Sequence, residues 1–315
     1  MTATALWHTD QTATELREVE LADAGLTVRS LYSLISTGTE RLVAKGEVPG
    51  ELQDKMRVPG MQGAFSFPLT YGYSLVGQVD EPGHALHQKH VHLLHPHQSA
   101  VRWLAAQLCV IPDGIPPLRA TLASNLETVV NAIWDSKVQI GDRVLVVGFG
   151  MIGALLSRVL SQIPALQLTI LEKADERRAL AADMGFALHD GQDDYDCAFH
   201  TTAQSAGLQA TLDAVGQEGR VVELSWYGIR QASLSLGGHF HYGRKQIISS
   251  QVSHLPAWKA ARWDFARRKA VVFRLLQQAV FDQHITQLLD FREAPDYFRA
   301  VRSGHPPALG TAIRY

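Results

Sequence analysis

The residues that most clearly predict chemistry lie between Arg143 and Leu160, in the segment RVLVVGFGMIGALLSRVL. An apolar run with strand character leads into Gly148, Gly150 and Gly153, which have the spacing GxGxxG, and a helical pattern follows. The first glycine permits a tight turn, the second lets backbone approach a pyrophosphate, and the third allows close helix packing. The helix amino terminus then faces the phosphates. These residues, together with Phe149, Met151 and Ile152, therefore predict a dinucleotide-binding bend.

Glu172 follows the third glycine by nineteen residues and ends the apolar run LQLTILEK. A carboxylate at this position accepts hydrogen bonds from both ribose hydroxyls of an adenosine and repels a 2′-phosphate. We therefore expect NAD(H) to be favoured. NADP(H) remains possible because Arg177 and Arg178 lie close by, although as an alternative both arginines are solvated cations on a helix. Methyltransferases that use S-adenosylmethionine share the glycine pattern and the acid, so the context must decide.

Length and composition limit the classes of function. The chain has 315 residues, of which 46% are hydrophobic, and this predicts two domains with ordinary cores. The formal net charge is −2, so no nucleic-acid or anionic membrane partner is expected. No leader pattern or bilayer-length apolar run is present, and we expect a cytoplasmic location. The two cysteines, Cys109 and Cys197, exclude a four-thiolate zinc site.

Two patterns divide the chain. Before residue 120, short β-like runs alternate with turns, as at residues 26–36, 73–80 and 90–97. From about residue 118 to residue 255, strand-like and helix-like segments alternate, which predicts a parallel sheet with covering helices. The dinucleotide unit is therefore internal, and methyltransferases rarely have this order.

Four segments together carry a family resemblance. They are ISTGTERL at 35–42, FPLTYGYSLVGQV at 67–79, KVQIGDRVLVVGFGMIG at 137–153, and ITQLLDFREAPDYFRAVRSG at 285–304 with TAIRY after it. In this order they resemble the medium-chain dehydrogenase/reductase superfamily, which includes zinc alcohol dehydrogenases and zinc-free quinone oxidoreductases. The resemblance implies an α/β fold: a GroES-like β-barrel domain formed by residues 1–117 and 266–315, and a Rossmann doubly wound sheet formed by residues 118–265.

The residues at the positions of the family's zinc ligands are unusual. By resemblance, Thr37 replaces the first cysteine, Tyr73 and Ser74 replace a His-Glu pair, and residues near Ser124 and Asn125 replace the second cysteine. Hydroxyl and phenol groups bind zinc poorly at neutral pH. We therefore expect no zinc.

A different metal site is the alternative, because six of the 14 histidines lie between His84 and His97. His95 and His97 are two residues apart on an expected strand and would share a face, with Glu40 or Glu127 as a further ligand. Rings that are solvated or hydrogen-bonded to backbone are the commoner outcome for such a run.

Without zinc, hydrogen-bond donors must stabilise the oxyanion that develops during hydride transfer. By resemblance, Thr39 aligns with the family's relay hydroxyl and Tyr73 points into the substrate site. Glu40 and Glu127 are candidate proton carriers, but each can instead cap a helix or pair with Arg41 or Arg119. For Tyr73 the alternative is a core tyrosine whose hydroxyl bonds to backbone.

The ends of two later strands complete the expected cofactor site. By resemblance, Ser225 and Trp226 follow the strand beside the nicotinamide, and Thr201 lies near the adenosine or pyrophosphate. The segment RKQIISSQV at 244–252 would supply an edge strand that joins two copies, so a homodimer is expected.

These patterns favour an NAD(P)(H)-dependent oxidoreductase that acts on a small-molecule alcohol, carbonyl or activated alkene. The STGTE turn also resembles bacteriochlorophyllide hydroxyethyl dehydrogenases, which would imply oxidation of a secondary alcohol on a large ring. A nucleotide-binding protein without catalysis, serving as a redox sensor or scaffold, is the alternative from another class.

Overall fold

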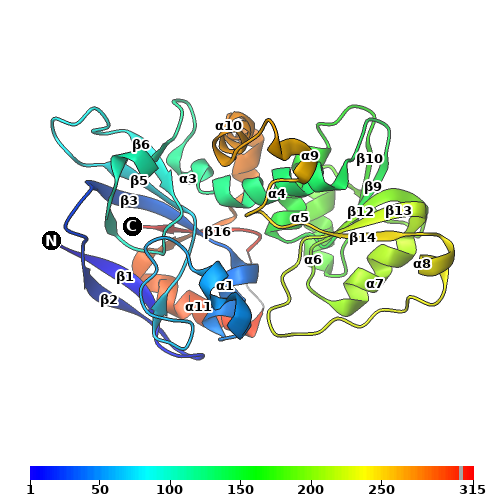
Figure 1. The fold of residues 1–315 in the computed structure, drawn as a ribbon, viewed down its shortest axis with the longest axis horizontal. Coiled ribbons are helices and arrows are strands. Elements are labelled where there is room, and N and C mark those ends of the chain that lie inside the picture. Colours follow the sequence, from blue (N-terminus) through cyan, green and yellow to red (C-terminus); the bar gives the residue numbers. More distant parts are fainter. Residues whose placement is uncertain (305–307) are drawn as a thin grey trace. The chain divides into compact units, whose positions relative to one another are not determined.

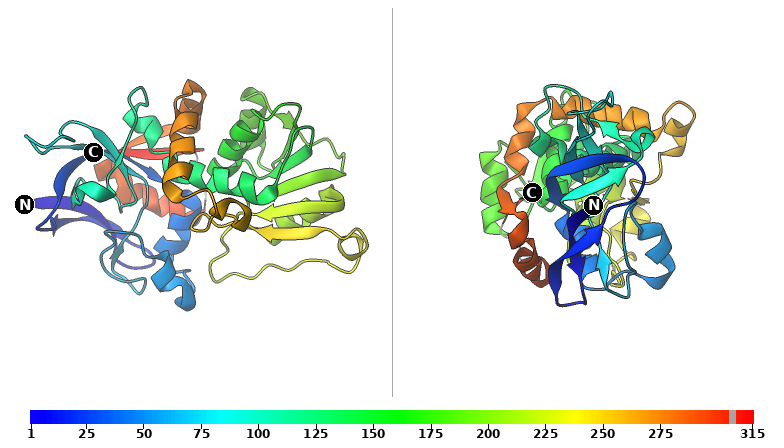
Figure 2. Two further views of the ribbon diagram at one scale, coloured as in Figure 1. Left: turned by 45° about the horizontal axis from the view of Figure 1, so that its top comes forward. Right: turned by 90° about the vertical axis from the view of Figure 1, so that its left-hand side faces the viewer.

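A computed structural model describes residues 1–304 and 308–315, and the chain forms two compact units. Unit 1 comprises Met1–Ser124 and Phe273–Tyr315, and unit 2 comprises Asn125–Val272. Both chain termini therefore lie in unit 1 (Figure 2). The sequence analysis drew these two boundaries after residues 117 and 265.

Unit 2 contains a six-stranded sheet in which all neighbouring strands are parallel (Figure 1). Its order is β11-β10-β9-β12-β13-β14, so the chain changes direction across the sheet between β9 and β12. This is a doubly wound sheet, as expected, and such sheets bind ligands at the carboxyl ends of the strands beside that point. The strands are β9 (Arg143–Val147), β10 (Gln167–Leu171), β11 (Ala187–Leu188), β12 (Tyr195–His200), β13 (Val215–Glu223) and β14 (Gln246–Ser249).

Helices pack on this sheet, and most residues of its central strands β9 and β12 are buried. Val144, Leu145 and Val146 are fully buried, and α5 packs on β9 and β10 while α7 packs on β12 and β13. The helices are α4 (Ala123–Ser136), α5 (Met151–Leu160), α6 (Asp175–Asp183), α7 (Ser205–Ala214), α8 (His239–Tyr242), α9 (Ala257–Ala260) and α10 (Phe265–Leu276).

Unit 1 is rich in β-structure and holds two sheets. The larger has the order β15-β16-β3-β5-β6-β8, with β7 also paired to β3, and the smaller has the order β2-β1-β4. The carboxyl-terminal β16 lies antiparallel to β3, so the end of the chain completes this unit. The strands are β1 (Thr2–His8), β2 (Thr14–Glu20), β3 (Leu26–Ile35), β4 (Leu69–Thr70), β5 (Leu75–Val79), β6 (His90–Leu93), β7 (Ala100–Trp103), β8 (Cys109–Val110), β15 (Gln287–Asp290) and β16 (Thr311–Arg314).

The helices of unit 1 are short and lie between its strands. They are α1 (Thr37–Ala44), α2 (Gln53–Met56), α3 (Pro117–Ala120) and α11 (Ala294–Ser303), with 3-10 turns at Gly50–Leu52, Ala105–Gln107, Ala279–His284 and Phe291–Glu293. The helix α1 begins directly after β3, and its first turn carries the residues of the STGTE motif. The two units together confirm the expected α/β fold class.

One expected strand is wrong in a way that affects the site. The sequence analysis placed His95 and His97 together on a strand, but β6 ends at Leu93 and both histidines lie in the connection to β7. Pro96 between them lacks the backbone N–H that a strand ladder requires. The two rings therefore do not share a strand face, and each has its own surroundings.

Candidate functional site

The glycine bend of residues 148–153 lies at the carboxyl end of β9, where α5 begins. Gly148 has a φ of +97°, which a residue with a Cβ rarely adopts. A Cβ on Gly153 would lie 2.0 Å from the Gly148 carbonyl oxygen, so only glycine lets α5 approach this closely. A Cβ on Gly150 would instead meet only Arg177 Nη1, at 3.1 Å. Gly148 and Gly153 shape the bend, whereas Gly150 keeps its backbone accessible.

The three other residues of the bend differ in their surroundings. Phe149 is fully buried and packs edge-on against Phe186, so its side chain belongs to the core. Met151 is buried as well, and Ile152 is half-buried. Phe149 can therefore contact a cofactor only through its backbone.

Glu172 lies beside the bend and is held there by backbone groups. Phe149 N donates to Glu172 Oε2 at 2.7 Å, while the backbone N–H groups of Lys173 and Ala174 donate to Oε1 at 2.8 and 2.9 Å. The carboxylate is thereby fixed next to the predicted pyrophosphate site, and one oxygen keeps lone pairs for a ribose hydroxyl.

The two arginines of α6 differ. Arg178 is 3.8 Å from Asp175 on an exposed surface, as a solvated helix cation would be. Arg177 instead reaches back to the bend, where Nη1 lies 3.5 Å from the Phe149 carbonyl oxygen. A cation therefore lies against the glycine bend.

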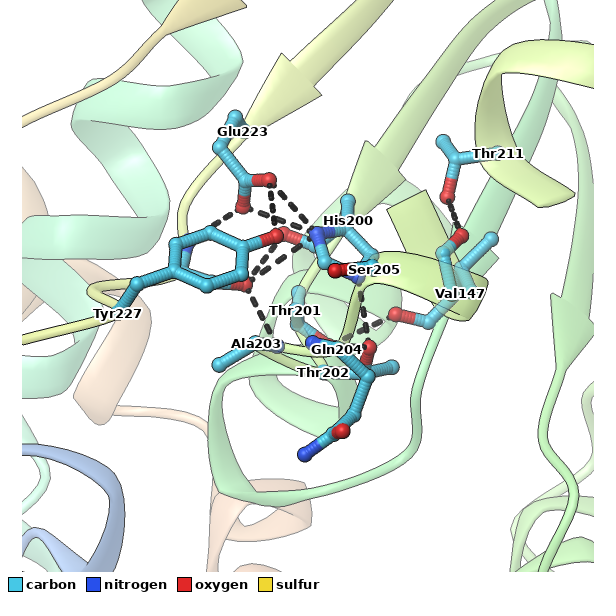
Figure 3. Close-up of polar contacts among 12 residues, drawn as sticks. Val147, His200, Thr201, Thr202, Ala203, Gln204, Ser205, Thr211, Glu223 and Tyr227 are labelled. Atoms are coloured by element: carbon cyan, nitrogen blue, oxygen red, sulfur yellow. Dashed lines mark hydrogen bonds and ion pairs between the residues drawn. The ribbon is translucent and has the colours of Figure 1, made fainter. Parts of the chain in front are cut away.

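A polar network occupies the carboxyl ends of β12 and β13 (Figure 3). His200 is fully buried: its Nδ1 lies 2.8 Å from Glu223 Oε2, and its Nε2 lies 2.6 Å from Thr202 Oγ1. Tyr227 donates its hydroxyl to Glu223 at 3.1 Å, and its ring stacks on His200. Burial and the Glu223 charge raise the pKa of Tyr227. This network is satisfied internally and fixes the loop after β13.

The predicted cofactor residues of these loops take part in the same construction. The Ser225 N–H donates to Glu223 at 2.7 Å, and its hydroxyl accepts the Ala203 N–H at 3.0 Å. The Thr201 hydroxyl donates to Val147 O at 3.0 Å, which ties β12 to the glycine bend. Trp226 is half-buried. The sequence analysis missed His200, Glu223 and Tyr227, although a polar residue ending each of two apolar strands was a visible signal.

In unit 1, the first turn of α1 meets Tyr73. The side-chain hydroxyls of Ser36 and Thr39 act on the Tyr73 phenol and lower its pKa. Burial has the larger and opposite effect, and with the nearby Glu40 charge it raises the Tyr73 pKa to about 12. Tyr73 and Thr39, predicted separately as catalytic residues, are thus neighbours, and Tyr73 remains a proton donor at neutral pH.

Glu40 is fully buried behind this turn. Its Oε1 accepts the Ser36 N–H at 2.7 Å, so the carboxylate caps α1, and its Oε2 lies 2.9 Å from His97 Nε2. His97 Nδ1 lies 2.7 Å from Ser33 Oγ, which in turn lies 2.8 Å from the Tyr315 hydroxyl. The capping role weighed for Glu40 is therefore present, together with a histidine that the sequence analysis did not link to catalysis.

Glu127 belongs to unit 2 and has different partners. It lies 2.5 Å from Lys269 Nζ and 3.4 Å from Arg268 Nη2 on α10. Arg119, a partner considered for it, instead pairs with Asp282 at 2.6 Å within unit 1. Glu127 is thus buried and ion-paired with two cations of α10.

The positions of the family's zinc ligands do not fit zinc. The Ser74 hydroxyl donates to Thr121 O at 2.5 Å, and the Ser124 hydroxyl donates to Tyr73 O at 2.7 Å. Thr37 adds a further hydroxyl, and such donors are poor zinc ligands. Among residues 1–304 and 308–315, no three His, Cys, Asp or Glu side chains form a group that could hold a metal.

The histidines of the 84–97 run are bonded within unit 1. His84 and His87 accept backbone N–H groups of Leu86 and Glu81 through Nδ1, and His92 Nε2 lies 3.1 Å from Ser74 Oγ. His95 Nδ1 lies 2.9 Å from Pro96 O, and its ring meets Trp103 edge-on. These rings therefore serve packing and hydrogen bonding.

Two of the buried histidines of unit 1 predict acid sensitivity. Burial, with the Arg302 and His97 charges, lowers the pKa of His8 to about 3, and burial with His97 lowers that of His95 to about 4. The unfolded chain binds these protons below about pH 6.5 while the folded chain does not, so stability falls as the pH drops. We expect a loss of roughly 2 kcal/mol per histidine at pH 5 relative to neutral pH. Urea unfolding at both pH values measures it, with His95→Gln reducing the loss; equal midpoints would contradict it.

The fold can now be compared with known proteins. No family model matches the sequence, and no curated protein matches it either. Solved structures match over the whole chain. A putative zinc-binding dehydrogenase from Sinorhizobium meliloti 1021, solved with NADP, is 16% identical, with a TM-score of 0.76 and 100% of both chains covered. The 2R,3R-butanediol dehydrogenase of Bacillus subtilis is 15% identical, with a TM-score of 0.78 and the same coverage.

A third structure, acetophenone reductase from Geotrichum candidum NBRC 4597 in complex with NAD, is 14% identical, with a TM-score of 0.75, and 100% of this chain and 97% of that chain are covered. The chain therefore has the same fold as these dehydrogenases and this reductase. In this chain the glycine bend and Glu172 lie together, joined by the Phe149 N–H bond to the Glu172 carboxylate. No helix in the described part of the chain is long and apolar enough to cross a membrane.

Proposed function

We propose that the protein is an NAD(P)(H)-dependent oxidoreductase that transfers hydride between nicotinamide and a small alcohol or carbonyl compound, or an activated alkene, without zinc. The observation that carries this proposal is the bend at Gly148–Gly153. A side chain at Gly153 would clash with the backbone of the bend, and the Glu172 carboxylate accepts the Phe149 N–H at 2.7 Å. These residues fit a dinucleotide because the bend accommodates a pyrophosphate and the acid accommodates the adenosine ribose.

When bound, the nicotinamide supplies or accepts the hydride. Tyr73 supplies the proton in the reducing direction. The Ser36 and Thr39 hydroxyls favour the ionised form of the phenol, which helps Tyr73 pass its proton to a substrate oxygen. As that oxygen gains negative charge, the phenol stabilises it and transfers its proton, while the two hydroxyls stabilise the resulting tyrosinate. In the oxidising direction the tyrosinate takes the alcohol proton.

Arg177 supports use of NADPH alongside NADH. Glu172 disfavours a 2′-phosphate, but the Arg177 guanidinium beside it favours one. We expect Arg177→Ala to weaken NADPH binding about tenfold and NADH binding at most about threefold. Fluorescence titration measures both affinities, and Arg178→Ala, which removes an exposed cation of the same helix, is the control. Equal losses for both cofactors would show that Arg177 has no role in discrimination.

A homodimer formed through β14 is part of the proposal. This strand is an edge of the unit 2 sheet, and Ile247 on it is 39% exposed. Exposed edges pair readily with another strand. Sedimentation analysis of the wild-type chain and of Ile247→Lys tests this assembly.

The experiment that tests the function is a turnover assay on chelator-treated protein of measured metal content. A panel of ketones, aldehydes, secondary alcohols and activated alkenes is offered with each cofactor. Metal-free turnover of any class supports the proposal. If removal of a bound metal abolishes the activity, the zinc-free assignment is overturned. Saturable NADH binding without turnover would favour the sensor or scaffold alternative.

A further inference from the structure

The side chains behind Tyr73 form a buried polar set whose members come from separate segments of unit 1. Glu40 comes from α1, His97 from the connection between β6 and β7, and Ser33 from β3. Glu40, His97 and Ser33 are each fully buried. Burying ionisable groups is costly, and well-packed apolar residues are often as stable or more stable in their place. The position of this set therefore calls for a reason other than stability.

Its geometry resembles an acid–histidine–serine triad, but its burial excludes that chemistry. The Ser33 hydroxyl has no exposed area and is engaged by both His97 and Tyr315. A nucleophile must reach a substrate, and this one does not. The role of the set must therefore lie at its other end, at Glu40.

Glu40 links the set to the candidate catalytic tyrosine. One carboxylate oxygen holds the Ser36 N–H at 2.7 Å and the other lies 2.9 Å from His97. The hydroxyls of Ser36 and Thr39, on the same turn, both act on the Tyr73 phenol and lower its pKa. The orientation of the Glu40 carboxylate thus determines where these two hydroxyls lie, and His97, held by Ser33, determines the orientation of the carboxylate.

We infer that Glu40 and His97 are positioning residues for proton transfer by Tyr73: they fix the Ser36–Thr39 turn and place a carboxylate behind the phenol. The inference rests on the proposed function. The carboxylate also acts through its charge, because a negative group near the phenol opposes tyrosinate formation. Other than Glu40, the groups that act on the phenol are the uncharged Ser36 and Thr39 hydroxyls, and the Tyr71 ring packs edge-on against it.

The test compares Glu40→Gln and His97→Gln with His95→Gln. Glu40→Gln keeps an oxygen for the Ser36 N–H but removes the charge, and His97→Gln keeps the charge. We expect both to lower kcat about 10- to 100-fold, because the Ser36–Thr39 turn loses its fixed position and in Glu40→Gln this loss outweighs the easier formation of tyrosinate. The KM for NADH should stay within about twofold of wild type. His95→Gln changes a second buried histidine, which bonds to Pro96 O instead of Glu40, and should leave kcat within about twofold.

A pH measurement separates positioning from a structural role. In Glu40→Gln the alkaline limit of activity and the ultraviolet titration of Tyr73, identified with Tyr73→Phe, should move to lower pH by about one unit. In His97→Gln neither the alkaline limit of activity nor the Tyr73 titration should move to lower pH. Unchanged kcat in both variants, or reduced kcat without the shift in Glu40→Gln, would overturn the inference. If the wild-type protein turns over nothing, the proposed function fails, while the Tyr73 titration still tests the Glu40 charge.

Discussion

Replacing Tyr73 with phenylalanine is expected to lower kcat for carbonyl reduction about 100- to 1,000-fold while leaving NADH binding unchanged. The substitution removes the most acidic hydroxyl of the Ser36–Thr39–Tyr73 cluster, which is the proposed source of the proton. Loss of one general acid costs this much in comparable sites. The fold should tolerate the change, because the ring is retained and the loss is confined to the interactions of the phenol hydroxyl with Ser36 and Thr39. Steady-state kinetics and cofactor titration measure the two effects separately.

The neighbouring Tyr71→Phe is the matched control. Tyr71 is fully buried, packs against Tyr73 at 6.2 Å between ring centroids, and donates its hydroxyl to Met56 O at 3.2 Å. It has no bond to the α1 turn among the described contacts, so its loss should change kcat by no more than about twofold. Equal kcat values for Tyr73→Phe and the wild-type protein would remove Tyr73 from the mechanism.

The second large effect is expected at Gly153. A Cβ there would lie 2.0 Å from the Gly148 carbonyl oxygen, and neither backbone segment can yield without disrupting the contact between α5 and β9. We expect Gly153→Ala to destabilise unit 2 by about 3 kcal/mol or more, a cost typical of overpacking a rigid site. Urea unfolding followed by tryptophan fluorescence measures the loss.

Gly150→Ala separates stability from binding at the same bend. Its φ of −80° suits any residue, and its Cβ would meet only the movable end of Arg177. Stability should therefore change by less than about 1 kcal/mol, whereas the added methyl group should weaken NADH binding about 10-fold or more because it blocks the approach of a pyrophosphate. A Gly150→Ala protein with wild-type affinity would show that the cofactor does not lie over this backbone.

The sequence was sufficient to predict the fold of unit 2 and its bend. The GxGxxG spacing and the alternation of apolar strands with helices depend on local geometry, and this geometry is visible in the residues themselves. Glu172 was found by the same argument, because an acid at the end of the second strand must lie near the first turn in a parallel sheet. Chain length predicted two domains, the resemblance suggested their bounds, and it named Thr39 and Tyr73 as separate candidates for the substrate site.

The sequence was not sufficient where long-range pairing determines the structure. His97 was expected to lie on a strand with His95, but Pro96 ends the strand ladder. The hydrogen-bond partners of His97, Ser33 and Glu40, are 64 and 57 residues away in the sequence. The His200–Glu223–Tyr227 network depends on two parallel strands lying side by side, and no local pattern specifies that pairing. The sequence did not decide whether Arg177 acts on the cofactor or is a solvated helix cation. The direction of its side chain depends on the rotamer and on where the bend lies relative to α6.

The central claim is that the Gly148–Gly153 bend binds a nicotinamide dinucleotide, and fluorescence titration of the purified chain with NADH tests it most directly. Energy transfer from tryptophan to NADH reports binding, with Gly150→Ala as the comparison and S-adenosylmethionine as a competitor. We predict saturable binding of one NADH per chain, weakened about tenfold or more in Gly150→Ala and unaffected by S-adenosylmethionine. Absence of saturable NADH binding, or displacement of NADH by S-adenosylmethionine, would contradict the assignment.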